Sequence, residues 1–209
     1  MIQCCSYIQV HQIETKRRQH MEESEWIQKM QQGDETAFFI IYEKYKNAAL
    51  RTAYLITGNR YTGEDILQET FIQCCLHINE LKDPATFKAW FYKILTRTAW
   101  KFAKKEKSAV PVENIFETID ESIEEDSEKT FLQKEERKKL FDAINSLDVK
   151  QRITVILYYY NEMSVSEIAK ATGSLEGTVK SRLFFARKKL YQKLKTDAFF
   201  KGRVCEKNG

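Results

Sequence analysis

The chain has 209 residues, enough for one large domain or two small domains that each bury a core. With only 7 Gly and 2 Pro, the composition favours long helices and argues against a sheet protein. The formal net charge of +4 is too small to indicate a nucleic-acid partner, so the distribution of charge must be examined instead. No apolar run reaches the roughly 20 residues that a membrane span needs, and residues 1–20 lack the apolar stretch of a signal peptide. We therefore expect a cytoplasmic, all-α protein without membrane insertion.

The cysteines give no sign of a disulfide framework or a zinc ribbon, because they are odd in number and lack CxxC spacing. Cys74, Cys75 and His77 are close enough in sequence to be considered as metal ligands. Adjacent residues of a helix point in different directions, however, and a buried hydrophobic role is favoured for Cys74. We assign no metal and no cofactor.

Hydrophobic patterning divides the chain into two helical parts. Residues 1–20 show no sustained helical stripe and are expected to be a disordered extension. Helical periodicity runs over residues 21–107, with four helices, and over residues 130–195, with a tail at 196–209. Residues 108–129 form an acidic, self-repelling tether that is expected to be flexible. Its acids, which meet no basic residue, are Glu113, Glu117, Asp120, Glu121, Glu124, Glu125, Asp126 and Glu128.

Helix starts are marked by side chains that can accept the N–H groups left unpaired in a first turn. Asp83 before Pro84 is the clearest case, because proline has no N–H to leave unpaired there. Thr62 with Asp65 three residues later resembles a capping box. The other predicted N-caps are Asp34 or Thr36, and Asp148.

The segment from residue 164 to 194 has the pattern of a helix-turn-helix. Ser164 and Glu167 form a capping box that begins a short helix, and Gly173 supplies the turn. A longer helix begins near Ser174 or Leu175, with an apolar stripe at spacings of three and four that comprises Leu175, Val179, Leu183, Ala186 and Leu190. The polar N-terminal end of such a helix can enter a DNA major groove.

The polar side of this longer helix is the predicted contact with duplex DNA. Lys180 and Ser181 are placed to reach base edges. Phosphate contacts are predicted for Thr178, Arg182, Arg187 and Lys188, in a segment that also includes Glu176 and Gly177. The alternative is a solvated basic face on an ordinary helical hairpin. The coincidence of capping box, turn glycine, stripe and basic face favours DNA binding.

The helix predicted from residue 84 to about residue 106 has two unlike faces. The buried stripe comprises Phe87, Phe91, Ile94, Leu95 and Phe102. The outward side carries aromatic and basic residues together: Tyr92, Lys93, Thr96, Arg97, Trp100, Lys101 and Lys104. Exposed rings stack on unpaired bases and cations follow phosphates, so this side predicts binding of single-stranded DNA. For Trp100 alone, a core position is an equal alternative.

The preceding helix predicts a protein partner. Asp65, Glu69 and Ile72 share one side, while Phe71 and Cys74 share another with Leu67 and Thr70. An acidic face with an apolar residue suits a protein surface better than DNA, although a solvated charged face remains the alternative.

Four runs in the chain together resemble the sigma-2 and sigma-4 signatures of extracytoplasmic-function (ECF) sigma factors of the sigma-70 family. They are GEDILQETF at 63–71, FKAWFYKI at 87–94, EIA at 167–169 and GTVKSRL at 177–183, in the family's order. The sequence departs from the family where Leu95, Thr96 and Arg97 replace a common Ala-Arg-Asn, and where Lys101 and Phe185 replace a common Asp and a common basic residue.

The resemblance implies two helical domains and a sigma factor rather than an enzyme. It implies that Asp65, Gln68, Glu69 and Phe71 dock on the clamp helices of core RNA polymerase. It further implies that the 84–106 helix opens and holds the minus-ten promoter element, that the helix-turn-helix recognises the minus-thirty-five element, and that an anti-sigma factor is a common partner. The rival interpretations are a helix-turn-helix regulator that binds duplex DNA without joining polymerase, and an adaptor that binds only proteins.

Overall fold

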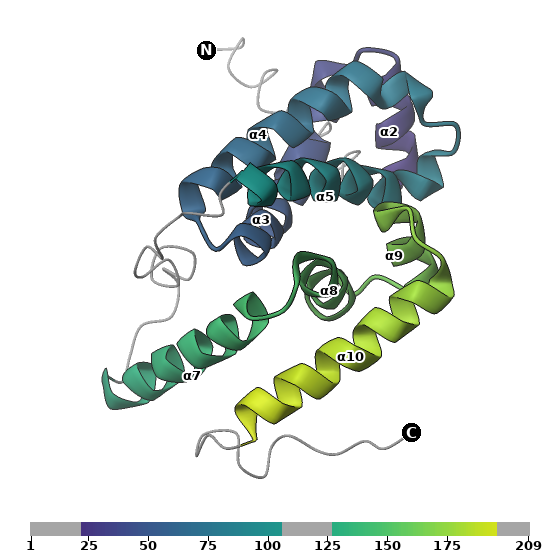
Figure 1. Ribbon diagram of the computed structural model, residues 1–209. Helices are drawn as coiled ribbons and strands as arrows, with labels where there is room; N and C mark the ends of the chain where they lie inside the picture. Colours follow the sequence, from purple (N-terminus) through teal and green to yellow (C-terminus); the bar gives the residue numbers. More distant parts are fainter. Residues whose placement is uncertain (1–21, 106–126, 196–209) are drawn as a thin grey trace, which may run out of the picture.

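The computed structural model describes residues 22–105 and 127–195 (Figure 1), so the expectations for the extension, most of the tether and the tail concern residues outside this part. The described residues form helices and no strand, which confirms the all-α prediction. The first group of helices contains α2 (Glu23–Gln31), α3 (Glu35–Thr57), α4 (Arg60–His77) and α5 (Phe87–Lys105), with 3-10 turns η1 (Ile78–Glu80) and η2 (Pro84–Thr86). The second contains α7 (Ser127–Asn145), α8 (Val149–Val155), the π-helical turn η3 (Ile156–Tyr160), α9 (Val165–Thr172) and α10 (Glu176–Leu194).

Three of the predicted helix starts are confirmed by hydrogen bonds. The side chains of Asp34, Asp83 and Asp148 accept backbone N–H groups of the first turns that follow them, at 3.1, 3.0 and 3.0 Å. Helix α7 begins at Ser127, so its backbone includes the last residues assigned to the tether. The tether therefore passes into helix slightly earlier than the sequence pattern indicated.

The predicted capping box at Thr62 is wrong. Helix α4 begins at Arg60, and the side chain of Asn59 accepts the N–H of Thr62 at 3.3 Å. Gly58 ends α3 in the left-handed conformation, with φ of 78°. Because this sharp turn leaves only Asn59 between the two helices, Asn59 must serve as the cap.

The core of the first group is an aromatic cluster that joins α3, α4 and α5. The Phe91 ring lies 5.1 Å from both Tyr45 and Phe71, and Tyr45 lies 5.3 Å from Phe87. Phe87, Phe91 and Leu95 are fully buried, as predicted for the stripe, while Ile94 and Phe102 are half-buried. Tilted and edge-on aromatic pairs each add about 0.5–1.5 kcal/mol beyond the burial of their area.

The core of the second group follows the predicted stripe of α10 with one correction. Val179, Leu183 and Ala186 are buried, but Leu175 is 80% exposed. Leu175 is the N-cap residue and has extended backbone, so its side chain precedes the helical stripe.

In helix α7, apolar spacing alone does not decide burial. Leu140 lies four and seven residues before Ile144 and Leu147, yet it is 41% exposed while Leu147 is buried. Phe141 instead stacks on Tyr54 of α3, with ring centroids 5.1 Å apart. This contact with the first group turns Leu140 toward solvent.

Replacement of Phe91 by Ala should lower the free energy of unfolding by about 3–5 kcal/mol, because it leaves a cavity among four aromatic neighbours. Urea unfolding followed by circular dichroism would measure the change. The matched control is Phe39→Ala, since Phe39 is 60% exposed on α3. Equal losses in the two variants would contradict a core role for the cluster.

Candidate functional site

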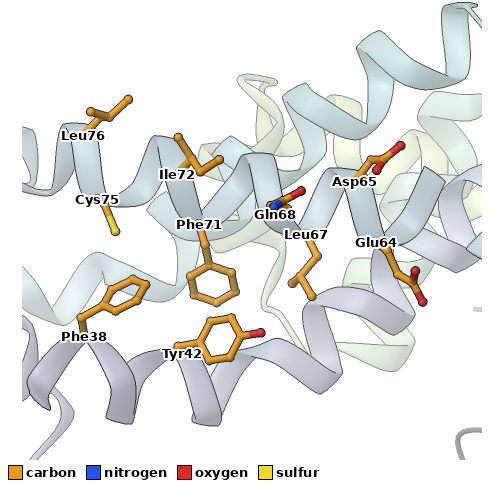
Figure 2. A pocket seen from close by; sticks show the side chains of 10 residues that line it. All are labelled: Phe38, Tyr42, Glu64, Asp65, Leu67, Gln68, Phe71, Ile72, Cys75 and Leu76. Atoms are coloured by element: carbon orange, nitrogen blue, oxygen red, sulfur yellow. The ribbon is translucent and has the colours of Figure 1, made fainter. Parts of the chain in front are cut away.

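A groove runs between α3 and α4 on the surface of the first group (Figure 2). Its volume is about 680 Å³. Phe71 forms its floor with Tyr42, whose ring lies 4.8 Å away, and with Phe38 at 6.3 Å. Ile72 and Leu76 continue along α4 and are 48% and 68% exposed. Such exposed apolar side chains beside an apolar groove are typical of a protein-binding surface.

One end of this groove is acidic. Glu64 and Asp65 line it, and Glu64 forms an ion pair with Arg60 at 2.9 Å. Figure 2 shows both carboxylates beyond Leu67, away from the aromatic floor. The groove therefore suits a partner that presents apolar side chains together with cations.

The structure brings together three of the four predicted polymerase contacts. Asp65 and Gln68 line the groove and are exposed, and Phe71 forms its floor although it is 5% exposed. Glu69 instead faces the opposite side of α4. The groove wall on α3 and the last turns of α4 were not predicted from the sequence, because a groove between two helices has no pattern in either helix alone. The missed lining residues are Phe38, Tyr42, Cys75 and Leu76.

A second groove lies between α4 and α5 and has a volume of about 780 Å³. Its α4 side carries Glu69 and, beyond it, His77, which pairs with Glu80 at 2.8 Å. Its α5 side carries cations and indole rings: Trp90, Lys93, Arg97, Trp100 and Lys101. Trp90 was not among the predicted DNA contacts, although its spacing of three and seven residues from Lys93 and Arg97 places it on their face.

The predicted exposure of Tyr92 and Thr96 is wrong. Tyr92 is 2% exposed and Thr96 is 4% exposed, whereas Trp100 is 38% exposed. Both buried residues lie under the second group of helices, and the Thr96 hydroxyl donates to the carbonyl of Ala171 at 3.2 Å. Lys104 lies in the last turn of α5, and its side chain is outside the described part of the chain. The basic and aromatic face of α5 is thus divided into an open edge and a covered edge.

The helix-turn-helix has the predicted caps. The Ser164 hydroxyl and N–H donate to the Glu167 carboxylate at 2.7 and 2.8 Å, and the N–H of Glu167 donates to Ser164 Oγ at 3.2 Å. Gly173 ends α9 with φ of 61°, a left-handed conformation that glycine adopts without strain. Helix α10 has no side-chain cap, because its N-cap residue, Leu175, has no polar side chain. The preceding Ser174 Oγ accepts a hydrogen bond from Arg182 at 2.9 Å.

The predicted duplex contacts lie together along the outer side of α10. Arg182 is half-buried and donates a hydrogen bond to Ser174. The Arg187 guanidinium lies 5.7 Å from the Tyr158 ring and 5.9 Å from the Tyr159 ring. Phe184 is 61% exposed on the same helix and can contact a thymine methyl group. The exposed predicted contacts are Glu176, Gly177, Thr178, Lys180, Ser181, Arg187 and Lys188.

The cysteines of the first group differ in burial. Cys74 is fully buried, as predicted, and burial raises the pKa of its thiol to about 12. Cys75 is exposed at the α3–α4 groove, and partial burial also raises its pKa. Among the described residues, no three His, Cys, Asp or Glu side chains gather as metal ligands, and no helix is long and apolar enough to cross a membrane.

Comparisons with known sequences define the class of protein. Residues 41–109 match the family model for Sigma-70 region 2, and residues 137–190 match that for Sigma-70, region 4. The chain is 31% identical to the RNA polymerase sigma factor SigV of Bacillus subtilis (strain 168) over 69% of this chain and 82% of that protein. It is 28% identical to the ECF RNA polymerase sigma factor SigW of the same organism, over 81% and 95% of the two chains. The chain belongs to the sigma-70 family and is an ECF sigma factor.

Solved structures share this fold. The chain matches CnrH, solved in complex with the cytosolic domain of CnrY, with a TM-score of 0.63 and 19% identity over 84% of this chain and 99% of that one. It matches the sigma factor RpoE of Bartonella quintana, solved with the anti-sigma factor NepR, with a TM-score of 0.59 and 22% identity over 77% and 98%. The chain therefore has the helical fold of these two solved structures.

The capping box predicts a pH dependence of stability. Burial acts to raise the pKa of Glu167, but hydrogen bonds from Ser164 and the charges of Lys88 and Lys170 lower it below its ordinary value of 4.5. The ionised carboxylate therefore stabilises the fold above pH 4.5, and this contribution is lost as the pH falls through the lowered pKa. Glu167→Gln should destabilise the chain at neutral pH and much less in acid, as measured by urea unfolding. A pH-independent difference would contradict this role.

Proposed function

We propose that this sigma factor binds core RNA polymerase through the α3–α4 groove, recognises the minus-thirty-five element with α10, and holds the unpaired minus-ten strand along α5. It acts as a subunit without catalysis of its own, in the cytoplasm where polymerase works. The observation that best supports this proposal is the presence of three chemically distinct surfaces on one chain. The groove is apolar and acidic, α10 presents an exposed polar and basic side, and α5 combines indole rings with cations.

The α5 edge of the second groove supports a role in holding unpaired bases. Trp90 and Trp100 offer ring surface, and the cations between them follow a phosphate backbone. Glu69 and Glu80 on the opposite wall repel phosphates and so favour a strand that lies toward α5. A protein that binds only duplex DNA does not need indole rings and cations together on α5.

Control by an anti-sigma factor is part of the proposal. The relative from Bartonella quintana was solved with such a partner. By family resemblance, we propose that a stress or envelope signal releases this chain from a similar inhibitor. The alternative function is a helix-turn-helix regulator that binds duplex DNA without joining polymerase, and α10 is equally suited to that role.

Transcription with purified core polymerase separates these functions. The chain should direct specific transcripts from a subset of a genomic promoter library. Binding to duplex DNA without any promoter-specific transcript would favour the regulator.

Carboxylates introduced at the groove rim should weaken binding to polymerase. Ile72→Asp and Leu76→Asp place carboxylates on exposed apolar positions, and each should weaken the affinity for core polymerase about tenfold or more. Fluorescence anisotropy of labelled sigma factor would measure the affinity. Phe39→Asp is the control, because Phe39 is exposed on α3 but does not line the groove. Unchanged affinity in both rim variants would refute the docking site.

Separate variants should divide duplex recognition from strand opening. Lys180→Ala should weaken binding to the minus-thirty-five element by about 1–3 kcal/mol, because it removes a contact with a base edge. Trp100→Ala should leave duplex binding intact and reduce promoter opening, since it removes a stacking surface. Gel shifts with duplex DNA and permanganate footprinting of open complexes would measure the two effects. Equal loss of duplex affinity in both variants would contradict the division.

A further inference from the structure

A pocket opens where α5, α8 and the turn between α9 and α10 meet. Arg97 and Trp100 of α5 line one side, Lys150 and Ile153 of α8 line a second, and residues 171–174 line a third. Its volume of about 350 Å³ is near the lower end of the roughly 300–1,000 Å³ that is typical of small-molecule sites. Residues from both groups of helices therefore form one concave surface of the size of a small ligand.

The charge of this pocket is entirely positive. Arg97 of α5, Lys150 of α8 and Arg182 of α10 line it together. None of the described residues in its lining carries a carboxylate. Cations gathered without a counter-ion repel one another, and a cleft lined by one sign of charge concentrates ligands of the opposite sign. The pocket therefore has the electrostatics of an anion site.

The carboxylate nearest to Lys150 in the sequence is engaged outside the pocket. Asp148 caps α8, where it accepts the N–H of Gln151 at 3.0 Å. Its carboxylate also pairs with Lys189 of α10 at 3.8 Å. Because Asp148 does not line the pocket, the charge of Lys150 remains available to a ligand.

The turn before α10 adds hydrogen-bond donors to this charge. Arg182 is half-buried and donates to Ser174 Oγ at 2.9 Å, so the Ser174 hydroxyl keeps its own proton to donate. A Cβ atom at Gly173 would meet no atom within 4 Å, so the turn leaves open space beside these donors. Helix α10 begins directly afterwards without a side-chain cap, and the positive end of its dipole favours an anion there.

An indole ring gives the pocket a second chemical character. Trp100 is 38% exposed and lies three residues after Arg97, so both share one face of α5. A planar base stacks on an exposed indole, whereas a phosphate binds cations. The combination of one ring with three cations suits a ligand that carries both a base and several phosphates.

We propose that this pocket binds a nucleoside polyphosphate, with its phosphates on Arg97, Lys150 and Arg182 and its base on Trp100. Arg97 and Trp100 also line the α4–α5 groove, and Arg182 is a predicted duplex contact, whereas Lys150 has no other assigned role. The nucleotide site is a property of the free chain and does not depend on the proposed sigma activity.

Lys150→Ala is the variant that tests this site. It removes one cation of the pocket and retains the backbone carbonyl of residue 150, which accepts the Thr154 hydroxyl at 2.7 Å. The matched control is Lys138→Ala, which removes the same charge from an exposed position of α7 outside the pocket. Circular dichroism would verify that each full-length variant retains its helix content.

Isothermal titration calorimetry of the free chain with ATP, GTP and inorganic tripolyphosphate would measure binding. At least one nucleotide should bind more tightly than tripolyphosphate. Lys150→Ala should weaken nucleotide binding about tenfold, because it removes a charge-assisted hydrogen bond, and Lys138→Ala should not. Absence of nucleotide binding, or equal losses in these two variants, would overturn the site.

Trp100→Ala tests the place of the base. It should weaken binding of the nucleotide and leave binding of tripolyphosphate unchanged, since only the base uses the ring. Tripolyphosphate that binds the wild-type chain as tightly as both nucleotides would overturn a nucleotide as the ligand.

A DNA strand is the other source of phosphates that these cations could bind. Anisotropy with a fluorescein-labelled, mixed-sequence single strand separates the two sources. Lys150→Ala should bind the strand within about twofold of the wild type, because an exposed lysine outside the strand-binding edge contributes little. Equal losses for strand and nucleotide would overturn a separate nucleotide site.

Transcription with core polymerase distinguishes this inference from the proposed function. A wild-type chain that binds nucleotide through Lys150 but directs no specific transcript would support the site and refute the sigma activity. Specific transcripts from a chain that binds no nucleotide would refute the site alone.

Discussion

The contact between Phe71 of α4 and Phe91 of α5 links the surfaces of the first group. The two rings lie 5.1 Å apart, and each also packs on α3, Phe71 through Tyr42 and Phe91 through Tyr45. On the α3 side, Phe71 forms the floor of the apolar groove. On the other side, the burial of Phe91 sets the rotation of α5 and so decides which of its residues face outward. One aromatic cluster thus positions, back to back, the groove that we assign to polymerase and the groove that we assign to DNA.

The neighbouring helices α4 and α5 carry opposite charges on the grooves that they line. Asp65 on α4 lies at the groove that we assign to polymerase, while the cations Lys93 and Arg97 on α5 line the groove assigned to DNA. Glu69 faces the DNA groove from the α4 side, where it limits how far a phosphate backbone can approach. The proposed polymerase groove and the proposed DNA groove therefore lie on opposite sides of α4 and differ in charge.

The interface between the two groups differs in character from the cores within them. Within the first group the contacts are large buried rings, whereas across the interface hydrogen bonds such as Asn161 with Tyr92 and Thr96 with Ala171 accompany the stack of Phe141 on Tyr54. Water can replace such partners when the groups separate, at a net cost of only about 0.5–1.5 kcal/mol for each hydrogen bond. Separation of large apolar cores costs more free energy, because it exposes their apolar surface to water.

Local sequence patterns determined the helices, the capping box of Ser164 and Glu167, and the buried stripe around Phe91, because these depend on neighbours within one or two turns. They also carried the family resemblance, since its motifs are local. Only the tertiary structure decided that Tyr92 is buried, because its partner Asn161 is 69 residues away in the chain. The groove that adds Tyr42 to the docking surface likewise exists only where two helices meet. Helical periodicity specifies which residues share a face, but what covers that face depends on packing with the rest of the molecule.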